Sequence, residues 1–263
     1  PFNLLSSALL WLERHAVSNS VEIKFAAGTY AETRQCFIRS PVTLTGNGAV
    51  VTGSGDPAVQ SHAPLAINDL TINAPGACAI LATADLTLAG VTLSAGAGAG
   101  DSGVLLVSNA LVVVNRDTTI NAVAGRTPFV VWNSGACVLQ GGTLTLNRPD
   151  AGNAVRILGT QFDTGLARLS TPGAGKIISI ADASRVSAPA ATLLNGATLA
   201  YDNALKATNG WRRDSATGII TQWGILIVPP SGQATIVFPV SFTTAMYAIA
   251  AGDAVGVINI FNG

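Results

Sequence analysis

Four short apolar blocks recur along the chain at a constant spacing. They occupy residues 79–82, 104–107, 129–132 and 154–157. A fixed period of this size is typical of stacked supersecondary units, each of which packs only on its neighbours. The spacing therefore predicts a solenoid rather than a closed globule.

Each block is followed by two further short runs rich in Val, Ile, Leu and Thr. After the block at 104–107 these runs are residues 111–114 and 118–120, and a fifth coil begins at 177. Gly, Asn, Asp and Ser separate the runs, as turns require. Three short strands per coil predict an all-β fold, a three-sided parallel β-helix, and parallel crossovers are right-handed by default.

Alternation along a strand predicts which side chains face the core. Arg156 is the one charge in the first strand of the repeats, so we place it outside, with Val155 and Ile157 inside. Stepping back by whole periods extends this register to the other coils. The predicted inward set is Val130, Trp132, Leu105 and Val107 in the first strands, Leu86, Leu88, Leu111, Val113, Cys137, Leu139 and Phe162 in the second, and Val91, Leu93, Ile120, Leu144, Leu146 and Leu169 in the third.

The outward residues differ between the strands of a coil. The third strands present Thr92, Thr119, Thr145 and Arg168, an ordinary solvated surface. The first strands present an apolar stripe, which should not meet water. Either the chain itself or another copy must cover this stripe, and we favour another copy. The stripe consists of Leu81, Val104, Leu106, Phe129 and Val131.

The two ends of the chain depart from the repeat. Apolar residues at 5, 8, 9 and 12 have the spacing of an amphipathic helix, which would cap the open apolar end of a solenoid. After about residue 205 the pattern becomes that of antiparallel hairpins. We expect a capping helix in residues 1–20, a β-helix in 21–204 and a small antiparallel β module in 205–263. A start without Met and an end in an apolar stretch indicate a fragment, and the family resemblance described below implies that the C-terminal module is truncated.

Composition argues against several classes of function. The formal net charge is zero and 11% of residues are charged, so a basic footprint for nucleic acid is absent. No apolar run is long enough for membrane insertion. His15 and His62 lack ligand-type neighbours at metal spacing, and three cysteines do not make a disulfide framework. We expect no cofactor and no metal.

An enzymatic function would require a set of catalytic residues placed close together. Cleavage of a polysaccharide needs two carboxyl groups that flank the sugar bond. Asp163 is the best outward candidate, and its column holds Val138, Val112 and Thr87 in place of a second acid. We therefore assign no catalytic residue, although a site assembled from two chains stays open.

Three motifs in the C-terminal part of the chain resemble a known family. They are residues 210–213 (GWRR), 218–224 (GIITQWG) and 238–242 (FPVSF), and their order is similar to that in the C-terminal receptor-binding domain of bacteriophage tail fibres. A helix followed by Gly28, Thr29 and Tyr30 also resembles the start of tail fibres and tailspikes, a pattern that polysaccharide lyases share.

This resemblance implies a homotrimeric virion fibre, assembled in the host cytoplasm, that attaches to a host cell-surface glycan or other receptor and to other tail proteins. The trimer interface would include Leu81, Leu106, Phe129 and Val131. The alternatives are a tailspike depolymerase and a purely structural shaft. Aromatic planes and guanidinium groups suit sugar recognition. The receptor-binding candidates are Trp211, Arg212, Arg213, Tyr201 and Tyr247.

Overall fold

A computed structural model describes residues 2–15, 19–76, 78–96, 103–180 and 185–201, together with the strand segments 204–205, 210–213 and 220–223. The chain divides into two compact units, Pro1–Asp202 and Asn203–Gly263. Each unit is described by itself below.

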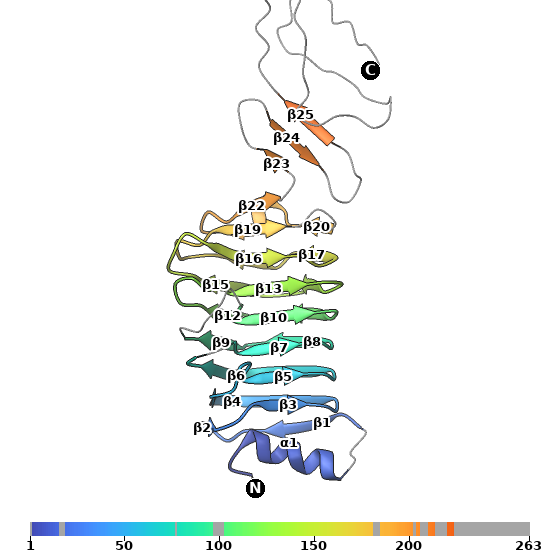
Figure 1. Cartoon of the computed structure of the whole chain (residues 1–263), viewed down its shortest axis with the longest axis vertical. Helices are drawn as coiled ribbons and strands as arrows, with labels where there is room; N and C mark the ends of the chain where they lie inside the picture. The colour runs from blue at the N-terminus through green and yellow to red at the C-terminus, as the bar shows by residue number, and fades with distance from the viewer. Residues whose placement is uncertain are drawn as a thin grey trace, which may run out of the picture. The chain divides into compact units, whose positions relative to one another are not determined.

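The first unit is a parallel β-solenoid that begins with one short helix, α1 (Leu5–Arg14). Its coils stack one on the next away from α1 (Figure 1). The first strands of the coils pair in one parallel column, which we call column one. Column one consists of β3 (Cys36–Ile38), β5 (Val59–Ser61), β7 (Ile80–Ala82), β10 (Leu105–Ser108), β13 (Phe129–Trp132), β16 (Asn153–Ile157), β19 (Ile177–Ile180) and β22 (Thr198–Tyr201).

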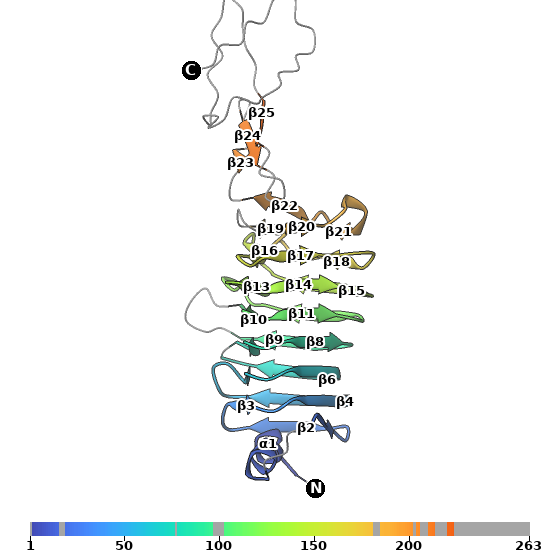
Figure 2. The ribbon, with the colours of Figure 1, turned by 90° about the vertical axis from the view of Figure 1, so that its right-hand side faces the viewer.

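Two further columns share the long strands β4 (Val42–Gly53) and β6 (Leu65–Ala74). The first half of β6 pairs with β8 (Leu86–Ala89) and its second half with β9 (Thr92–Ala95). From β8 and β9 onward, columns two and three consist of separate strands. Figure 2 shows column two face on. Column two continues through β8 (Leu86–Ala89), β11 (Leu111–Val114), β14 (Ala136–Leu139), β17 (Gln161–Asp163) and β20 (Arg185–Ser187), and column three through β9 (Thr92–Ala95), β12 (Thr118–Asn121), β15 (Thr143–Asn147), β18 (Arg168–Ser170) and β21 (Leu193–Leu194).

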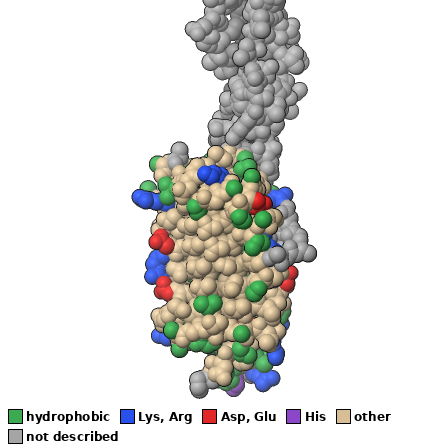
Figure 3. Space-filling model, turned by 90° about the vertical axis from the view of Figure 1, so that its left-hand side faces the viewer, with side chains coloured by type: hydrophobic (Ala, Val, Ile, Leu, Met, Phe, Trp, Pro, Cys, Tyr) green, Lys and Arg blue, Asp and Glu red, His purple; other side chains and the backbone are tan. Residues whose placement is uncertain are grey.

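The inward set of column three is as predicted. All six residues of that set are at most 1% exposed. Thr92, Thr119 and Thr145 stack outward on neighbouring strands. Beside them the Asn121 amide donates to Ser94 Oγ (3.2 Å). Figure 3, which views the solenoid from the side where Figure 1 draws β9, β12 and β15, shows charged side chains mainly along the edges of this face.

The predicted register of column one is wrong at β13. A constant period would pair Leu105 with Val130, but Leu105 pairs with Phe129, one residue short of the period. Phe129 in turn pairs with Val155, one residue beyond the period. The two deviations cancel, so the prediction holds for Leu105 and Val155 but slips by one residue between them. A slip of one residue exchanges the two faces of a strand. Phe129 and Val131 are therefore fully buried in the core, while Val130 and Trp132 lie on the outer side.

The same kind of slip occurs in column two. Leu86 pairs with Val112 rather than with Leu111, the partner that a constant period predicts. Val112 is fully buried, whereas Leu111 and Val113, predicted to face inward, turn outward, and Leu111 is 37% exposed. The other predicted inward residues of this column, Leu86, Leu88, Cys137, Leu139 and Phe162, are buried as expected.

These registers correct the proposed interface stripe. Phe129 and Val131, like Val104, lie in the solenoid core and cannot contact another copy. Leu81 and Leu106 do face outward, where they pack with Cys78, Val130 and Trp132 in a second apolar cluster.

The chain itself covers the middle of this outer cluster. Leu106 is 7% and Val130 2% exposed in a single chain. A Cβ atom at Gly103 would lie 2.9 Å from Val130 Cγ2 and 3.1 Å from Leu106 Cδ2. The backbone of Gly103 therefore packs closely on the cluster, and a larger residue there would push it away.

Helix α1 closes the first end of the solenoid, as predicted. Leu5, Leu9 and Leu12 join the core and are at most 6% exposed. Leu4, the residue that precedes the helix, offers no side-chain cap. Instead the buried carboxylate of Glu32, the last residue of β2 (Thr29–Glu32), accepts hydrogen bonds from the backbone N–H groups of Leu5 and Ser6. A carboxylate at this position satisfies free N–H donors and complements the helix dipole.

The register at β13 predicts a large difference between two substitutions. Phe129→Ala removes a fully buried ring and should cost about 3–5 kcal/mol of unfolding free energy. Leu111→Ala, at an outward position of the neighbouring column, should cost less than about 1 kcal/mol. Urea denaturation measures both, and similar costs for the two variants would contradict the register.

The cap predicts that Glu32→Ala frees α1 from the solenoid. Two N–H donors then lose their acceptor in a buried setting, at a cost of about 1–3 kcal/mol. Amide hydrogen exchange should become faster in α1 but not in the central coils. Glu22→Ala, which removes an exposed carboxylate, is the matched control, and equal effects of the two variants would refute the capping role.

Candidate functional site

The second unit contains four of the five predicted receptor-binding residues, and three of them lie in its described strands. Its described strands, β23 (Ala204–Leu205), β24 (Gly210–Arg213) and β25 (Ile220–Trp223), pair antiparallel with β24 in the middle. Trp211 pairs with Leu205 and Gln222, and Arg212 pairs with Ala204 and Thr221. The central strand of this small sheet thus carries Trp211, Arg212 and Arg213.

Tyr201 and Tyr247 are not part of these described strands. Tyr201 ends β22 in the first unit, where it pairs with Ile180 of β19. Tyr247 and the FPVSF run lie outside the described residues.

The acid that the sequence singled out has a local structural role. Asp163 lies on the outer side of column two between Val138 and Ser187. Its Oδ1 accepts a hydrogen bond from the N–H of Gly165 (2.8 Å) in the turn that follows. Val138 in turn pairs with Val113 of β11, and not with Val112 as the sequence predicts, because of the slip in column two described above. Neither neighbouring strand supplies a second acid for glycosidic cleavage.

The corner between columns two and three gathers charged residues that are distant in sequence. Arg116 donates from Nη2 to Asp69 Oδ1 (2.7 Å), two coils earlier, and to the carbonyl of Ala89 (3.3 Å). Asp117 Oδ1 accepts from the N–H of Thr143 (2.7 Å) in the next coil. The sequence analysis did not predict that Asp69, Arg116 and Asp117 share a corner. The recurrence of turn residues once per coil could have revealed the corner, but not the hydrogen bond of Arg116 with Asp69 across two coils.

This corner is hollowed. An open hollow of about 290 Å³ is lined by Gly90, Arg116, Asp117 and Gly142. Sites for small molecules usually occupy about 300–1,000 Å³, so the hollow is at the small end of that range.

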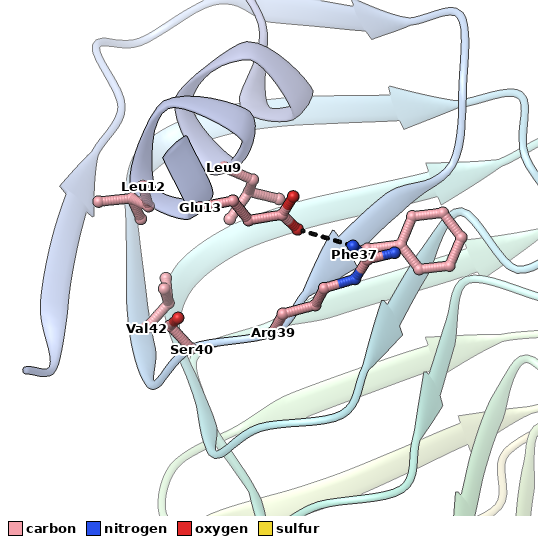
Figure 4. A pocket seen from close by; sticks show the side chains of 7 residues that line it. All are labelled: Leu9, Leu12, Glu13, Phe37, Arg39, Ser40 and Val42. Atoms are coloured by element: carbon pink, nitrogen blue, oxygen red, sulfur yellow. Dashed lines mark ion pairs between the residues drawn. The ribbon is translucent and has the colours of Figure 1, made fainter. Parts of the chain in front are cut away.

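A much smaller hollow lies between α1 and the first coils. Figure 4 shows its lining, including the ion pair of Glu13 with Arg39 (3.5 Å). Its volume is about 10 Å³, which holds at most one water molecule. The Arg39 guanidinium also lies 5.3 Å from the centre of the Phe37 ring. This ion pair links α1 to Arg39, the residue that follows β3, and the hollow beside it is too small for a ligand.

A charge cluster with a buried arginine and a partly exposed aspartate lies in the turn after β15. Arg148 forms a bidentate pair with Asp150, at 2.6 and 2.9 Å, and also donates to Thr127 Oγ1 (3.1 Å) and to the Asn153 carbonyl (3.0 Å). Asp150 in turn accepts from the N–H of Gly125 (3.1 Å). Each nitrogen of the guanidinium is already bonded, so this cluster is a brace between coils rather than a binding site.

Cysteine chemistry and metal binding find no support in the described part of the chain. Burial raises the pKa of the Cys36 and Cys78 thiols to about 12, and it raises the pKa of Cys137 as well. Thiols of this kind are poor nucleophiles. The described residues include no group of three or more potential metal ligands. They also include no helix long and apolar enough to cross a membrane.

Comparison with known proteins bears on the C-terminal segment. The fold is that of a β-solenoid protein with a small additional β unit. Residues 213–262 match the family described as "Putative tail fiber protein gp53-like, C-terminal". The chain has no match among curated proteins and none among solved structures. The matched segment contains the GIITQWG and FPVSF runs, so the resemblance to phage tail fibres is confirmed there. This family implies a virion-associated protein.

The Arg148–Asp150 brace predicts a specific dependence of stability on pH. Hydrogen bonds from Arg148 hold the pKa of Asp150 at about 2, below its ordinary value of 3.8. A lowered folded-state pKa stabilises the fold above pH 3.8, and the stabilisation is lost as pH falls toward about 2. Thermal unfolding between pH 5 and 2 should show a smaller acid-induced loss for Asp150→Asn than for the wild type. Parallel losses would rule out this contribution.

Proposed function

We propose that this protein is a phage tail-fibre adhesin that attaches the virion to a structure on the host cell surface. The observation that carries the proposal is the tail-fibre family match at residues 213–262, in a chain whose first unit is a β-solenoid. A solenoid whose coils pack only on their neighbours is suited to a stiff spacer. The C-terminal unit would then be the recognition module, in which Trp211, Arg212 and Arg213 are the candidates for contact with a glycan.

The proposed assembly is a homotrimer of right-handed, three-sided solenoids. Of the interface residues expected from sequence, Leu81 and Leu106 face outward, and Leu106 is largely covered by its own chain. A trimer would present three copies of the recognition module on one fibre. Multivalency can raise avidity by about 10²–10⁴ over a single weak site. Other tail proteins and the host receptor would be the further partners.

The recognition module predicts that Trp211→Ala in the full chain weakens attachment to bacterial cells. Truncation of a hot-spot aromatic residue in an interface costs about 2 kcal/mol or more, so we expect a loss of about thirtyfold or more. Flow cytometry with labelled protein measures attachment, and thermal unfolding checks the fold. Arg212→Ala and Arg213→Ala are measured separately, because successive strand positions face opposite sides of a sheet.

Trp11→Ala is the matched control. Trp11 is a 44% exposed tryptophan on α1, so its loss should leave attachment unchanged. Unchanged attachment of a correctly folded Trp211→Ala variant would assign Trp211 a structural role. Release of reducing sugar from the bound cell-surface polysaccharide would instead indicate a depolymerase.

A further inference from the structure

Two glycines, Gly90 and Gly142, help to line the hollow at the corner between columns two and three. Gly90 and Gly142 adopt left-handed conformations, with φ of 68° and 69°, at this corner in two different coils. Between them the corner of the coil from β11 to β12 supplies Arg116 and Asp117. A Cβ atom on Gly90 would lie 2.4 Å from Asp69 Oδ1, and one on Gly142 would lie 2.7 Å from Asp117 Oδ1. The two glycines therefore allow the charged groups to lie close against the backbone.

Hydrogen-bonding capacity remains on both walls of this hollow. Arg116 uses Nη2 for Asp69 and Ala89, and its Nε and Nη1 have no hydrogen-bond partner among the described residues. Asp117 and Asp69 each use Oδ1, and their Oδ2 atoms likewise have no partner in the described part of the chain. Among the described residues, nitrogen atoms of Arg116 without a partner thus lie near a carboxylate oxygen of Asp117 without a partner.

The pairing of Arg116 with Asp69 contributes little to stability. Their side chains are 56% and 46% exposed, and exposed ion pairs contribute about 0–1 kcal/mol. This weak pairing therefore does not explain why the Arg116 guanidinium lines a hollow together with Asp117 and two glycines. Pre-positioned polar groups around a concave surface are instead characteristic of small-molecule sites.

We propose that this corner of the solenoid binds a sugar unit through two neighbouring hydroxyl groups. A hydroxyl is both a donor and an acceptor, so adjacent hydroxyls can accept from Arg116 and donate to Asp117 at the same time. Hydrogen bonds to charged groups are the stronger kind. The volume of about 290 Å³ fits a single sugar unit of a longer chain. The site lies in the first unit and does not require the C-terminal recognition module.

The test is a titration of the isotope-labelled full chain with methyl glycosides of glucose, galactose, mannose, rhamnose, N-acetylglucosamine and glucuronic acid. At least one glycoside should shift the backbone amide resonances of Gly90 and Gly142 in a saturable manner. Arg116→Met and Asp117→Asn should each weaken that binding by about tenfold, the usual effect of losing one charged hydrogen bond. Because the Arg116–Asp69 pair is exposed, the melting temperature should barely change.

The matched controls are Arg39→Met and Glu13→Gln, which break the partly exposed ion pair at α1. Both should bind the glycoside as the wild type does. Trp211→Ala should also bind normally, so failure of the receptor module does not affect the result. The proposal is wrong if no glycoside in the set shifts Gly90 and Gly142, or if the shifts persist in Arg116→Met and Asp117→Asn.

Discussion

The inward stack of aliphatic side chains, held in register from coil to coil, is the interaction on which the structure depends. Val107, Val131 and Ile157 occupy equivalent positions on successive paired strands and are fully buried. Neighbouring strands lie about 4.8 Å apart, so each side chain packs on its counterparts above and below. Because the strands of a coil in these columns pair with those of the adjacent coils, the pairing register decides which residues reach the core and which reach the surface.

The ends and corners of the coils depend on that register. A stack of coils leaves an open apolar end, and α1 covers it with Leu5, Leu9 and Leu12 while Glu32 fixes the start of the helix. At the corners the register brings together residues that are one or two coils apart in sequence. At one corner Arg148 donates a buried hydrogen bond to Thr127 of the preceding coil. At another corner, the Nε and Nη1 atoms of Arg116 have no hydrogen-bond partner among the described residues.

Sequence periodicity was sufficient to predict the solenoid and its cap, because both follow from where apolar residues recur. It was not sufficient to fix every face. Phe129 pairs one residue short of the period on one side and one residue beyond it on the other, so the slip leaves no trace in the spacing. The hydrogen bond between Arg116 and Asp69 could not be predicted from the sequence either. It depends on how the turns of three coils align, which no local pattern encodes. The tail-fibre resemblance needed no structure, because its motifs are continuous in sequence.

The most direct test of the register is the reactivity of single cysteines placed along β11. Leu111→Cys and Val113→Cys should react readily with a water-soluble maleimide in the native protein, because both positions lie on the outer side of column two. Val112→Cys and Val114→Cys should react only after unfolding, since both positions are at most 1% exposed. Cys36, Cys78 and Cys137 are buried and should contribute little background. Fast labelling at 112 and 114 with protection at 111 and 113 would contradict the register.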